Sequence, residues 1–546
     1  MASPSGLLWI KAIELEYQQI QDNGVWHLVS LPKGAKPLGT KLVLRRKFLA
    51  SGDVDKLKAR LVIQGQRMRK DIDYDETFAA VAQITTLRML CAVAAERNLT
   101  LMCLDFDAAF TQSPIDKELF VKIPDGMSLT KDNQGNNQVL RLDKGLYGTK
   151  QGSRLWWNTI SAWLFKYGFV SDIAGDPCLF KLEKQGQTML LMLYTDDALM
   201  AFDIKSSESL YKNFLVDLAK DLKFTDRGAL TWFLGYCSKQ DITAGTVALD
   251  QKLFIKTMLE DNRMTEAYGK FTPSEPGKIP GENCQPKETP EGLKEQAEMK
   301  HRPFRNRVGS LLWLYRGTKP IIGYIVGMLT RVLHNPGFTH WDATSWVLRY
   351  IKNTADEPIT YHRTQGGATL VGYVDSDYLP NYGDEYDNRK STTGWCFFIG
   401  DAVVSWKSAR QECVAASTCE AEYMGAWSAV KELVYLRKLL KFMGAPQTGP
   451  TSLYEDNQAC IRISENPCDG ERVKHIDAKY HLVRQNVMNK IVKLHYCSTE
   501  NMVADAFTKA LAGPKIKKFN AFMMGADKPP HANGKDIEDA GKPKLK

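Results

Sequence analysis

The sequence predicts a multidomain α+β protein, and three observations lead to this prediction. The chain has 546 residues, which is too long for one ordinary hydrophobic core. Apolar residues make up 44% of it and charged residues 25%, which are the proportions of a globular protein. Short apolar runs that fit buried strands alternate with longer segments of helical periodicity. We therefore expect several domains that combine helices with sheets.

Bulk composition narrows the classes of protein without selecting a function. The formal net charge of +9 fits an ordinary mildly basic protein, and it also fits a protein with a polyanionic partner. The 11 Cys residues form no Cys-x-x-Cys pair, which argues against zinc knuckles and a disulfide framework and favours a reducing compartment. No apolar run reaches the length of a membrane span, and Met1–Gly6 lacks the features of a secretory signal.

The start of the chain predicts one helix and several strands. Leu7–Ile20 is amphipathic, and strands are expected over Trp26–Val29 and Lys41–Lys47. A hairpin turn at Gly52-Asp53 leads into Lys56–Ile63, an alternating strand with cations on one face. On charge patterning alone, a solvated edge strand is the favoured interpretation of this face. A clamp for a triphosphate is the alternative.

The segment around which the chain is organised is Met189–Phe202, where two apolar runs flank Asp196 and Asp197. The pattern predicts a hairpin with this acidic pair at its bend. Adjacent carboxylates near a core repel each other and are poorly solvated. Mg²⁺ would remove that cost, because it prefers hard oxygen ligands. The alternative is an ordinary solvated turn, in which Asp is common.

A second acidic cluster favours the metal interpretation. Thr85–Asn98 predicts a helix, and Leu104–Phe110 then places Asp105 at the end of an apolar run. Carboxylates at the ends of two neighbouring strands are positioned to hold two metal ions.

The middle of the chain predicts loops and helices. Residues 124–137 are polar and rich in Gly, Asp and Asn. The Gly-rich segment Leu142–Arg154 either permits close approach of a backbone or nucleobase or is a flexible entry to a helix. The other expected elements are helices at Leu155–Tyr167 and Ser207–Leu222, a strand and turn at Leu230–Tyr236, a Pro-rich linker or exposed loop at 272–300, and a mainly helical segment at Phe304–Ile351.

From Thr369 onward, the expected order is three strands, helix, strand, helix, strand, helix. Carboxylates recur at similar places in these elements. Asp375 ends the first strand, Glu422 lies near the start of a long helix, Asp456 ends another strand, and Asp505 lies in the first turn of a helix. One acidic strand end is usually a solvated turn, but four that converge would form a second two-metal centre.

An ordered set of motifs resembles the reverse transcriptase–ribonuclease H portion of copia-type LTR retrotransposon polyproteins. The resemblance runs from about Trp9 to Leu511, and each motif is weak by itself. The motifs are Lys58-Ala-Arg-Leu-Val, Asp73-Tyr-Asp-Glu-Thr-Phe, Leu104-Asp-Phe-Asp-Ala-Ala-Phe, Lys144-Gly-Leu-Tyr-Gly-Thr-Lys-Gln, Tyr194-Thr-Asp-Asp, Trp232-Phe-Leu-Gly, Val308-Gly-Ser-Leu, Arg389-Lys-Ser-Thr-Thr-Gly, Glu420-Ala-Glu-Tyr, Lys474-His-Ile-Asp and Ala504-Asp-Ala-Phe-Thr-Lys.

The resemblance implies a right-hand polymerase with fingers, palm and thumb, followed by a ribonuclease H-like α/β domain. The expected domains are fingers and palm at 1–235, a thumb or connecting helical region at 236–366 with a Pro-rich loop at 272–300, a ribonuclease H-like domain at 367–512 and a basic, disordered tail at 513–546.

The resemblance also assigns expected site residues. The catalytic and metal-binding carboxylates would be Asp105, Asp196 and Asp197 in the polymerase, and Asp375, Glu422, Asp456 and Asp505 in the nuclease. The nucleotide-binding residues would be Lys58, Arg60, Phe110, Lys144 and Gly145, and the primer grip would be Trp232, Phe233, Leu234 and Gly235. Phe110 would close the pocket beside the sugar 2′ carbon; from the residues alone, a core aromatic is the favoured interpretation.

The function implied is RNA- and DNA-templated DNA synthesis with hybrid-specific ribonuclease H cleavage, by two-metal phosphoryl transfer. The cofactor would be Mg²⁺, two ions per site, with Mn²⁺ as a substitute. The implied partners are an RNA template, an RNA/DNA hybrid, a primer RNA, deoxynucleoside triphosphates, and the capsid protein and integrase of the same element, with no membrane. The implied localisation is cytoplasmic, in a virus-like particle, or nuclear. The alternative is a decayed or repurposed copy that only binds nucleic acid.

Three departures from the family pattern stand out. Thr195 replaces the usual Val before the Asp pair and keeps its β-branched shape. Lys319-Pro320 continues into Ile321 where the family has Asp, and the loop between Asp377 and Arg389 is longer than usual. None removes a carboxylate. Protease, integrase and zinc-knuckle motifs are absent, so the chain is expected to be one segment of a larger product or a truncated one.

Overall fold

The computed structural model describes residues 6–48, 54–127, 131, 137–275, 278–378, 390–465 and 477–532. The predicted turn at Gly52-Asp53, the long loop before Arg389 and the Lys474 motif lie outside the described residues, apart from the last residue of that motif. By its internal contacts the chain divides into two compact units, residues 1–82 with 102–228 and residues 83–101 with 229–546. This division by contacts does not test the predicted functional domains, which remain predictions.

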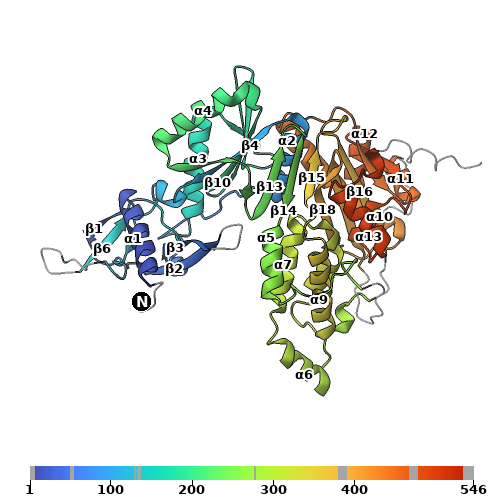
Figure 1. Ribbon diagram of the computed structural model, residues 1–546, viewed down its shortest axis with the longest axis horizontal. Coiled ribbons are helices and arrows are strands. Elements are labelled where there is room, and N and C mark those ends of the chain that lie inside the picture. The colour runs from blue at the N-terminus through green and yellow to red at the C-terminus, as the bar shows by residue number, and fades with distance from the viewer. Residues whose placement is uncertain are drawn as a thin grey trace, which may run out of the picture. The chain divides into compact units, whose positions relative to one another are not determined.

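The first unit contains the elements that precede residue 229 in the chain, except α2, and in Figure 1 these run from blue to green. Only the first two residues of β4 and the last of β11 lie beyond its limits. These elements are α1 (Gly6–Asp22), β1 (Trp26–Ser30), β2 (Thr40–Phe48), β3 (Val54–Ile63), η1 (Gly65–Arg67), β4 (Thr100–Phe106), η2 (Ala109–Gln112), β5 (Phe120–Val121), β6 (Gln138–Leu142), α3 (Gly152–Tyr167), β7 (Val170–Ser171), β8 (Leu179–Lys184), β9 (Gln187–Tyr194), β10 (Asp197–Phe202), α4 (Ile204–Asp221) and β11 (Phe224–Ala229).

A six-stranded sheet in the order β11-β4-β10-β9-β8-β7 is the main scaffold of this unit. Smaller sheets have the orders β1-β6-β5 and β2-β3. The predicted hairpin is confirmed, because β9 and β10 pair antiparallel from Tyr194 and Asp197 to Met189 and Phe202. The side chains of both strands are mostly buried. The sheet edge where β4 ends and the β9–β10 hairpin turns carries the first acidic cluster.

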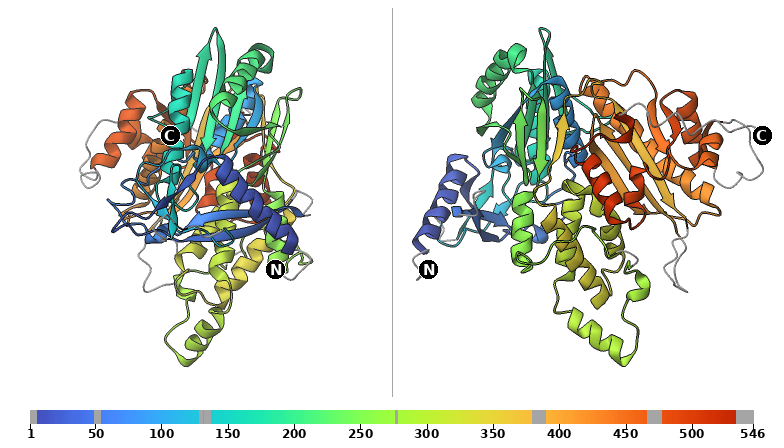
Figure 2. Two further views of the ribbon diagram at one scale, coloured as in Figure 1. Left: turned by 90° about the vertical axis from the view of Figure 1, so that its left-hand side faces the viewer. Right: turned by 45° about the vertical axis from the view of Figure 1, so that its right-hand side comes forward.

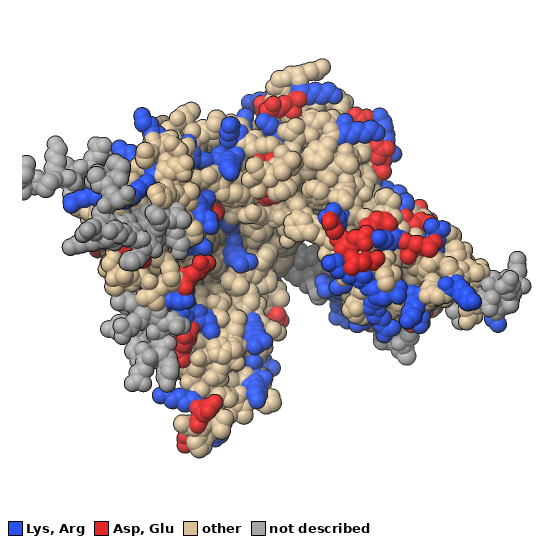
Figure 3. Space-filling model, turned by 180° about the vertical axis from the view of Figure 1, so that it is seen from behind, with Lys and Arg blue, Asp and Glu red and all other residues tan. Residues whose placement is uncertain are grey.

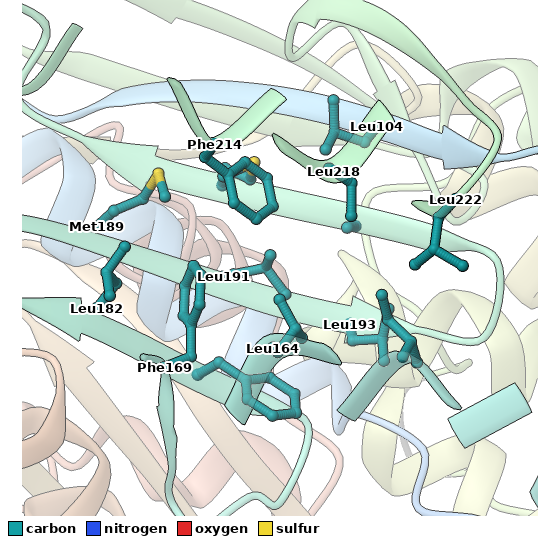
Figure 4. Packing of buried hydrophobic residues seen from close by; sticks show 14 of the residues in the cluster. Leu104, Leu164, Phe169, Leu182, Met189, Leu191, Leu193, Phe214, Leu218 and Leu222 are labelled. Atoms are coloured by element: carbon teal, nitrogen blue, oxygen red, sulfur yellow. The ribbon is translucent and has the colours of Figure 1, made fainter. Parts of the chain in front are cut away.

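Helices α3 and α4 cover this sheet and enclose its core (Figure 4). Ile160 and Leu164 of α3 recur at helical spacing and are fully buried, as are Phe214 and Leu218 of α4. Burial of a side chain such as Phe214 stabilises the fold by about 1.5–3 kcal/mol. Helix α3 ends at Gly168, whose φ of +115° only glycine adopts easily. The acidic hairpin therefore stands on a rigid base.

The second unit contains the following elements. They are α2 (Ile84–Arg97), β12 (Trp232–Phe233), β13 (Tyr236–Asp241), β14 (Thr246–Asp250), α5 (Lys252–Asp261), η3 (Glu282–Cys284), α6 (Pro290–Met299), α7 (Phe304–Gly317), η4 (Pro320–Ile322), α8 (Gly323–Arg331), α9 (Phe338–Asn353), β15 (Ile359–His362), β16 (Leu370–Asp377), β17 (Thr392–Ile399), β18 (Ala402–Arg410), α10 (Thr418–Phe442), β19 (Thr451–Glu455), α11 (Gln458–Glu465), α12 (Asp477–Met488), β20 (Val492–Tyr496), η6 (Val503–Phe507), α13 (Gly513–Met523) and η7 (Pro530–Ala532).

A five-stranded sheet in the order β18-β17-β16-β19-β20 organises the later part of this unit (Figure 2, right). Strands β16, β17 and β18 form an antiparallel meander, and β16-β19 and β19-β20 are parallel pairs. Helix α10 packs against β16 and β17. Because parallel strands end on the same edge, a carboxylate near the end of β16 and one directly after β19 come together there.

Helix α2 belongs to the second unit although its sequence interrupts the first. Its Arg88 is buried, and the guanidinium donates to the carbonyls of Val404 at 2.7 Å and Arg316 at 2.7 Å. The same group lies 3.9 Å from the ring centroid of Trp406. Strand β4, which carries Asp105, begins only three residues after α2 ends. The strand of the first acidic cluster thus continues directly from a helix anchored in the second unit.

The structure corrects three expectations. The tail from residue 513 is not disordered throughout, because Gly513–Met523 forms α13 and buries Ile516, Phe519 and Phe522. The expected linker at 272–300 includes α6 and the short η3. The last expected helix, with Asp505 in its first turn, is reduced to the 3₁₀ turn η6. No helix in the described part of the chain combines the length and apolar character needed to cross a bilayer.

Candidate functional site

The first acidic cluster is built on a strained two-residue turn. Tyr194 pairs with Asp197 at the end of the β9–β10 ladder, which leaves Thr195 and Asp196 as the turn. Thr195 has a φ of +55°, a conformation that costs a β-branched residue about 1–2 kcal/mol. The indole of Trp156 donates to the Thr195 carbonyl at 2.5 Å. Backbone strain of this kind is retained where the surrounding structure enforces it, often at functional sites.

Strand β4 brings Asp105 to the same edge of the sheet. The backbone N–H of Phe106 donates to the Asp196 carbonyl at 2.7 Å, which fixes β4 beside the turn. Asp105 is half-buried, and its carboxylate pairs with the guanidinium of Arg227 at 2.5 Å. Asp196 and Asp197 are also half-buried. The structure therefore places the three predicted polymerase carboxylates together, with Arg227 as an additional cation among them.

The predicted nucleotide-binding residues belong to the first unit, as does this cluster. Phe110 lies in η2, partly buried, with its ring 5.3 Å from that of Tyr147 in an edge-to-face arrangement. Gly145 approaches so closely that a Cβ there would lie 2.7 Å from the Phe110 carbonyl oxygen. Arg60 of β3 lies 5.1 Å from the Tyr147 ring centroid. Tyr147 therefore links Phe110 to Arg60.

Two further lysines complete that group of predicted residues. Lys144 donates from Nζ to the Asn23 carbonyl at 2.7 Å, which holds the loop that Gly145 continues. Lys58 lies opposite Arg45 in the β2–β3 ladder. On the face of the molecule that Figure 3 shows, Lys and Arg side chains are interspersed with Asp and Glu. Charge patterning by itself therefore does not distinguish an edge strand from a triphosphate clamp.

The predicted primer-grip residues lie in the second unit. Trp232 and Phe233 form β12, and Leu234 and Gly235 form the turn to β13 with φ values of +52° and +87°. Phe233 is buried, whereas Trp232 is exposed. A rigid hairpin thus presents one aromatic side chain to solvent.

The second acidic cluster is more tightly gathered than the first. Asp375 lies near the end of β16, Asp456 directly follows β19, and Glu422 lies early in α10. One ligand atom from each of these three residues lies within 4.8 Å of the others. Among the described residues, this is the one such group of three or more potential metal ligands.

Burial gives this cluster unusual electrostatics. Burial raises the pKa of Asp375 to about 7, and the nearby ammonium of Lys509 opposes the shift. Burial, followed by repulsion from Glu455, raises the pKa of Glu422 well above its usual range. The Oε2 atoms of Glu422 and Glu455 are buried without a hydrogen-bond partner. Unpartnered hard oxygens in a convergent acidic group fit a divalent cation.

The fourth predicted nuclease carboxylate, Asp505, lies outside this convergent group. It is buried, and its two carboxylate oxygens pair with Lys509 and Lys515, each at 2.9 Å. Lys509 also lies 3.6 Å from Asp375. The hydroxyl of Thr508 donates to Asp375. The structure therefore brings Asp505 near Asp375 through a shared lysine rather than through a shared open site.

Several residues at these sites were missed by sequence reasoning. The missed residues are Trp156, Arg227, Tyr147, Glu455, Thr508, Lys509 and Lys515. Lys509 had a readable signal, since an acid followed four residues later by a lysine often forms an ion pair. Arg227 and Trp156 had none, because they reach the first cluster through tertiary packing alone.

Residues 23–276 match the family described as "Reverse transcriptase (RNA-dependent DNA polymerase)". Over 512 residues, 93% of this chain, the sequence is 33% identical to the "Retrovirus-related Pol polyprotein from transposon TNT 1-94" of Nicotiana tabacum, of which it covers 37%. It is 30% identical to the corresponding polyproteins from transposons RE2 and RE1 of Arabidopsis thaliana, over 96% of this chain and 34% of each relative. The chain thus spans about a third of the length of these curated relatives.

Proposed function

We propose that this protein is an RNA-directed DNA polymerase that also cleaves the RNA strand of RNA–DNA hybrids. Residues 23–276 belong to the reverse transcriptase family, and nearly the whole chain is similar to copia-type Pol polyproteins. One observation carries the proposal: within the matched segment, the Phe106 N–H to Asp196 carbonyl bond holds Asp105 beside the acidic turn.

In the proposed arrangement, residues 1–235 are fingers and palm, 236–366 the thumb or connecting region, and 367–512 a ribonuclease H-like domain. The six-stranded sheet with its acidic hairpin would be the palm. The five-stranded sheet supports the last assignment, since its carboxylates gather at the common end of two parallel strands.

In the first centre, Asp105, Asp196 and Asp197 would hold divalent cations through their carboxylate oxygens. Two bound Mg²⁺ ions, with Mn²⁺ as a substitute, would neutralise the reacting phosphate and align the attacking and leaving oxygens. Arg227 now pairs with Asp105 and would exchange that carboxylate for a phosphate oxygen of the substrate.

The residues around Phe110 would bind the incoming deoxynucleoside triphosphate. Arg60 and Lys58 would bind its phosphates, since guanidinium and ammonium groups form charge-assisted hydrogen bonds with phosphate. The close approach of Gly145 to the Phe110 backbone leaves no space for a side chain. Phe110, held edge-to-face by Tyr147, would exclude a 2′-hydroxyl sterically.

In the second centre, Asp375, Glu422 and Asp456 would bind a divalent cation and direct water at a phosphodiester of the RNA strand. Water would attack phosphorus, the bond to the leaving oxygen would break, and that oxygen would take a proton. The partners proposed for the whole protein are the RNA template, primer RNA, hybrid and deoxynucleoside triphosphates, together with the capsid protein and integrase of its element. A cytoplasmic particle, or the nucleus, is the proposed location.

Primer extension tests this function directly. The full chain, an RNA template with an annealed DNA primer, the four deoxynucleoside triphosphates and Mg²⁺ should yield extended primer. Asp196→Asn should reduce extension on the order of 10³-fold or more, because a carboxylate that holds the cations supplies several kcal/mol. Hybrid binding without extension by the unsubstituted protein would instead support a copy that only binds nucleic acid.

A further inference from the structure

Asp505 differs from the other three proposed nuclease carboxylates in that both of its oxygens already have cationic partners. Oδ1 forms an ion pair with Lys509 Nζ at 2.9 Å without hydrogen-bond geometry, and Oδ2 accepts a hydrogen bond from Lys515 Nζ at 2.9 Å. Lys515 is itself held by the Thr499 carbonyl at 2.7 Å. Asp505 is almost completely buried. Both of its oxygens would have to give up a buried ion pair before they could face a metal ion, and breaking such pairs is costly.

The local backbone explains why Lys509 reaches this position. The 3₁₀ turn η6 ends at Phe507, and the N–H groups of Thr508 and Lys509 both bond to the Asp505 carbonyl, at 3.2 and 3.1 Å. This tight return folds the Lys509 side chain back over Asp505. The adjacent Thr508 hydroxyl binds Asp375, so the same turn also fixes the carboxylate at the end of β16.

The ammonium of Lys509 consequently lies between two carboxylates. It is 2.9 Å from Asp505 and 3.6 Å from Asp375, the position that a cation bridging those two residues would take. The ligand atoms of Asp375, Glu422 and Asp456 converge separately, and Glu422 there keeps a buried, unpartnered oxygen. The cluster therefore contains one position for a divalent cation and one position already filled by a lysine.

We propose that Lys509 takes the place of a second divalent cation in this centre, so that the centre binds one ion on Asp375, Glu422 and Asp456 while Asp505 anchors the lysine. The inference rests on the proposed hybrid-cleaving function and changes its ion count. Lys509 is 37% exposed whereas Asp505 is 1% exposed. The ammonium can therefore also face a backbone phosphate of the bound strand and neutralise its charge.

Ion stoichiometry tests the proposal without relying on activity. Full chain carrying Asp196→Asn and Asp197→Asn, which silences the first centre, is titrated with Mn²⁺, and bound ions per chain are counted by electron paramagnetic resonance and calorimetry. One ion is expected with Lys509 present. Lys509→Met keeps the aliphatic stem and should raise the count to two, because the Asp375–Asp505 position becomes free. Lys509→Arg should restore one.

Lys515→Met is the matched control. It removes the other ammonium from Asp505 but leaves the Lys509–Asp375 contact, so the count should stay at one. Two ions bound with Lys509 present, or one ion in a folded Lys509→Met protein, would overturn the proposal. If Lys509→Met fails to fold, the test uses the protein that keeps Lys509 and the Lys509→Arg protein. One bound ion in each supports the proposal, and two overturn it. Asp375→Asn should abolish binding; retained binding there would refute the metal centre of the proposed function itself.

Discussion

The two acidic centres of this chain differ in how completely the folded protein prepares them. In the first centre, Asp105 is 29% exposed and pairs with Arg227, itself 54% exposed, at an open sheet edge. In the second, Asp375 is only 2% exposed, and its ligand atom converges with those of Glu422 and Asp456. The carboxylates of the first centre share one end of a sheet and are half-buried. In the second centre the three ligand atoms lie within 4.8 Å of one another, and Asp375 and Glu422 are buried.

This difference follows from how each centre is assembled. The first stands on β4 and the β9–β10 hairpin, which are neighbours in one sheet, and a strained turn sets the position of Asp196. The second draws its carboxylates from the ends of two strands and from a helix, and two of the three, Asp375 and Glu422, are buried. The contrast yields several expected outcomes.

The largest expected effect concerns α2. This helix lies in the sequence between the two segments of the first unit but belongs to the second unit. Leu87, Met89, Leu90 and Val93 of α2 are fully buried, and together they contribute about 6–12 kcal/mol, comparable to the roughly 5–15 kcal/mol stability of a whole domain. Residues 229–546 expressed alone should show no cooperative thermal transition. The same fragment with residues 83–101 fused through a flexible linker should show one. Equal melting of both fragments would mean that α2 is dispensable for the second unit.

A smaller effect is expected from His531, which lies against β16 of the second unit. Its Nε2 donates to the Gly400 carbonyl at 3.1 Å, so Nδ1 accepts from the Tyr373 hydroxyl at 3.0 Å. Burial lowers the pKa of His531 to about 4. The unfolded chain therefore binds more protons than the folded chain between pH 4 and about 6.5. The contribution of His531 to the free energy of unfolding is fully present above pH 6.5. It falls by up to about 3 kcal/mol as the pH drops from 6.5 to 4.

Urea unfolding of the wild type and His531→Gln across pH 4–7.5 measures this contribution. The difference in unfolding free energy between them should shrink as the pH falls, because glutamine does not titrate. The buried carboxylates of the second centre affect both proteins alike and cancel in the difference. A difference that stays constant with pH would show that His531 does not titrate as expected.

Phe110 tests the exposed character of the first centre. Phe110→Val should raise the ratio of ribonucleotide to deoxyribonucleotide incorporation by about tenfold or more. The smaller side chain removes a few carbons that would otherwise clash with a 2′-hydroxyl. Synthesis from deoxyribonucleotides should largely persist, because the ring is only partly buried and packs against the core cluster from outside. Single-nucleotide extension with each nucleotide type gives the ratio. An unchanged ratio in a folded, active variant would assign Phe110 to packing instead.

The smallest effect is expected at the strained turn. Thr195→Gly removes the left-handed strain but adds unfolded-state entropy, so the first unit should be stabilised by at most about 1 kcal/mol. Gln185→Gly is the control, because Gln185 also has a positive φ, of +53°, but is not β-branched. Urea unfolding should show the larger gain for Thr195→Gly. A clear loss of stability at Thr195 would mean that its side chain, rather than its backbone, matters to the turn.

Much of the local structure was predictable because burial leaves a strong pattern. The hairpin of β9 and β10 was predicted from two uniform apolar runs, and the acid-ended strands β16 and β19 were predicted from the change of residue type at their ends. Helix α13 was missed because its lysines suggested disorder, although Ile516, Phe519, Phe522 and Met523 repeat at helical spacing.

The rest depends on contacts between distant segments, which sequence periodicity does not encode. The helical pattern of α2 was readable, but nothing in it indicated that Arg88 would bind carbonyls some 230 and 316 residues away. Asp505 was correctly expected near the other carboxylates. The two lysines that bind it determine whether it can ligate an ion, and only the fold brings Lys515 to it.

Whether the chain carries two separate centres can be measured in a single reaction. A labelled RNA template annealed to a labelled DNA primer allows primer extension and RNA cleavage to be followed together in the same tube. Asp197→Asn should reduce extension on the order of 10³-fold and leave hybrid cleavage intact, and Glu422→Gln should do the reverse. Loss of both activities from either single substitution, in a protein that retains its thermal transition, would contradict the account.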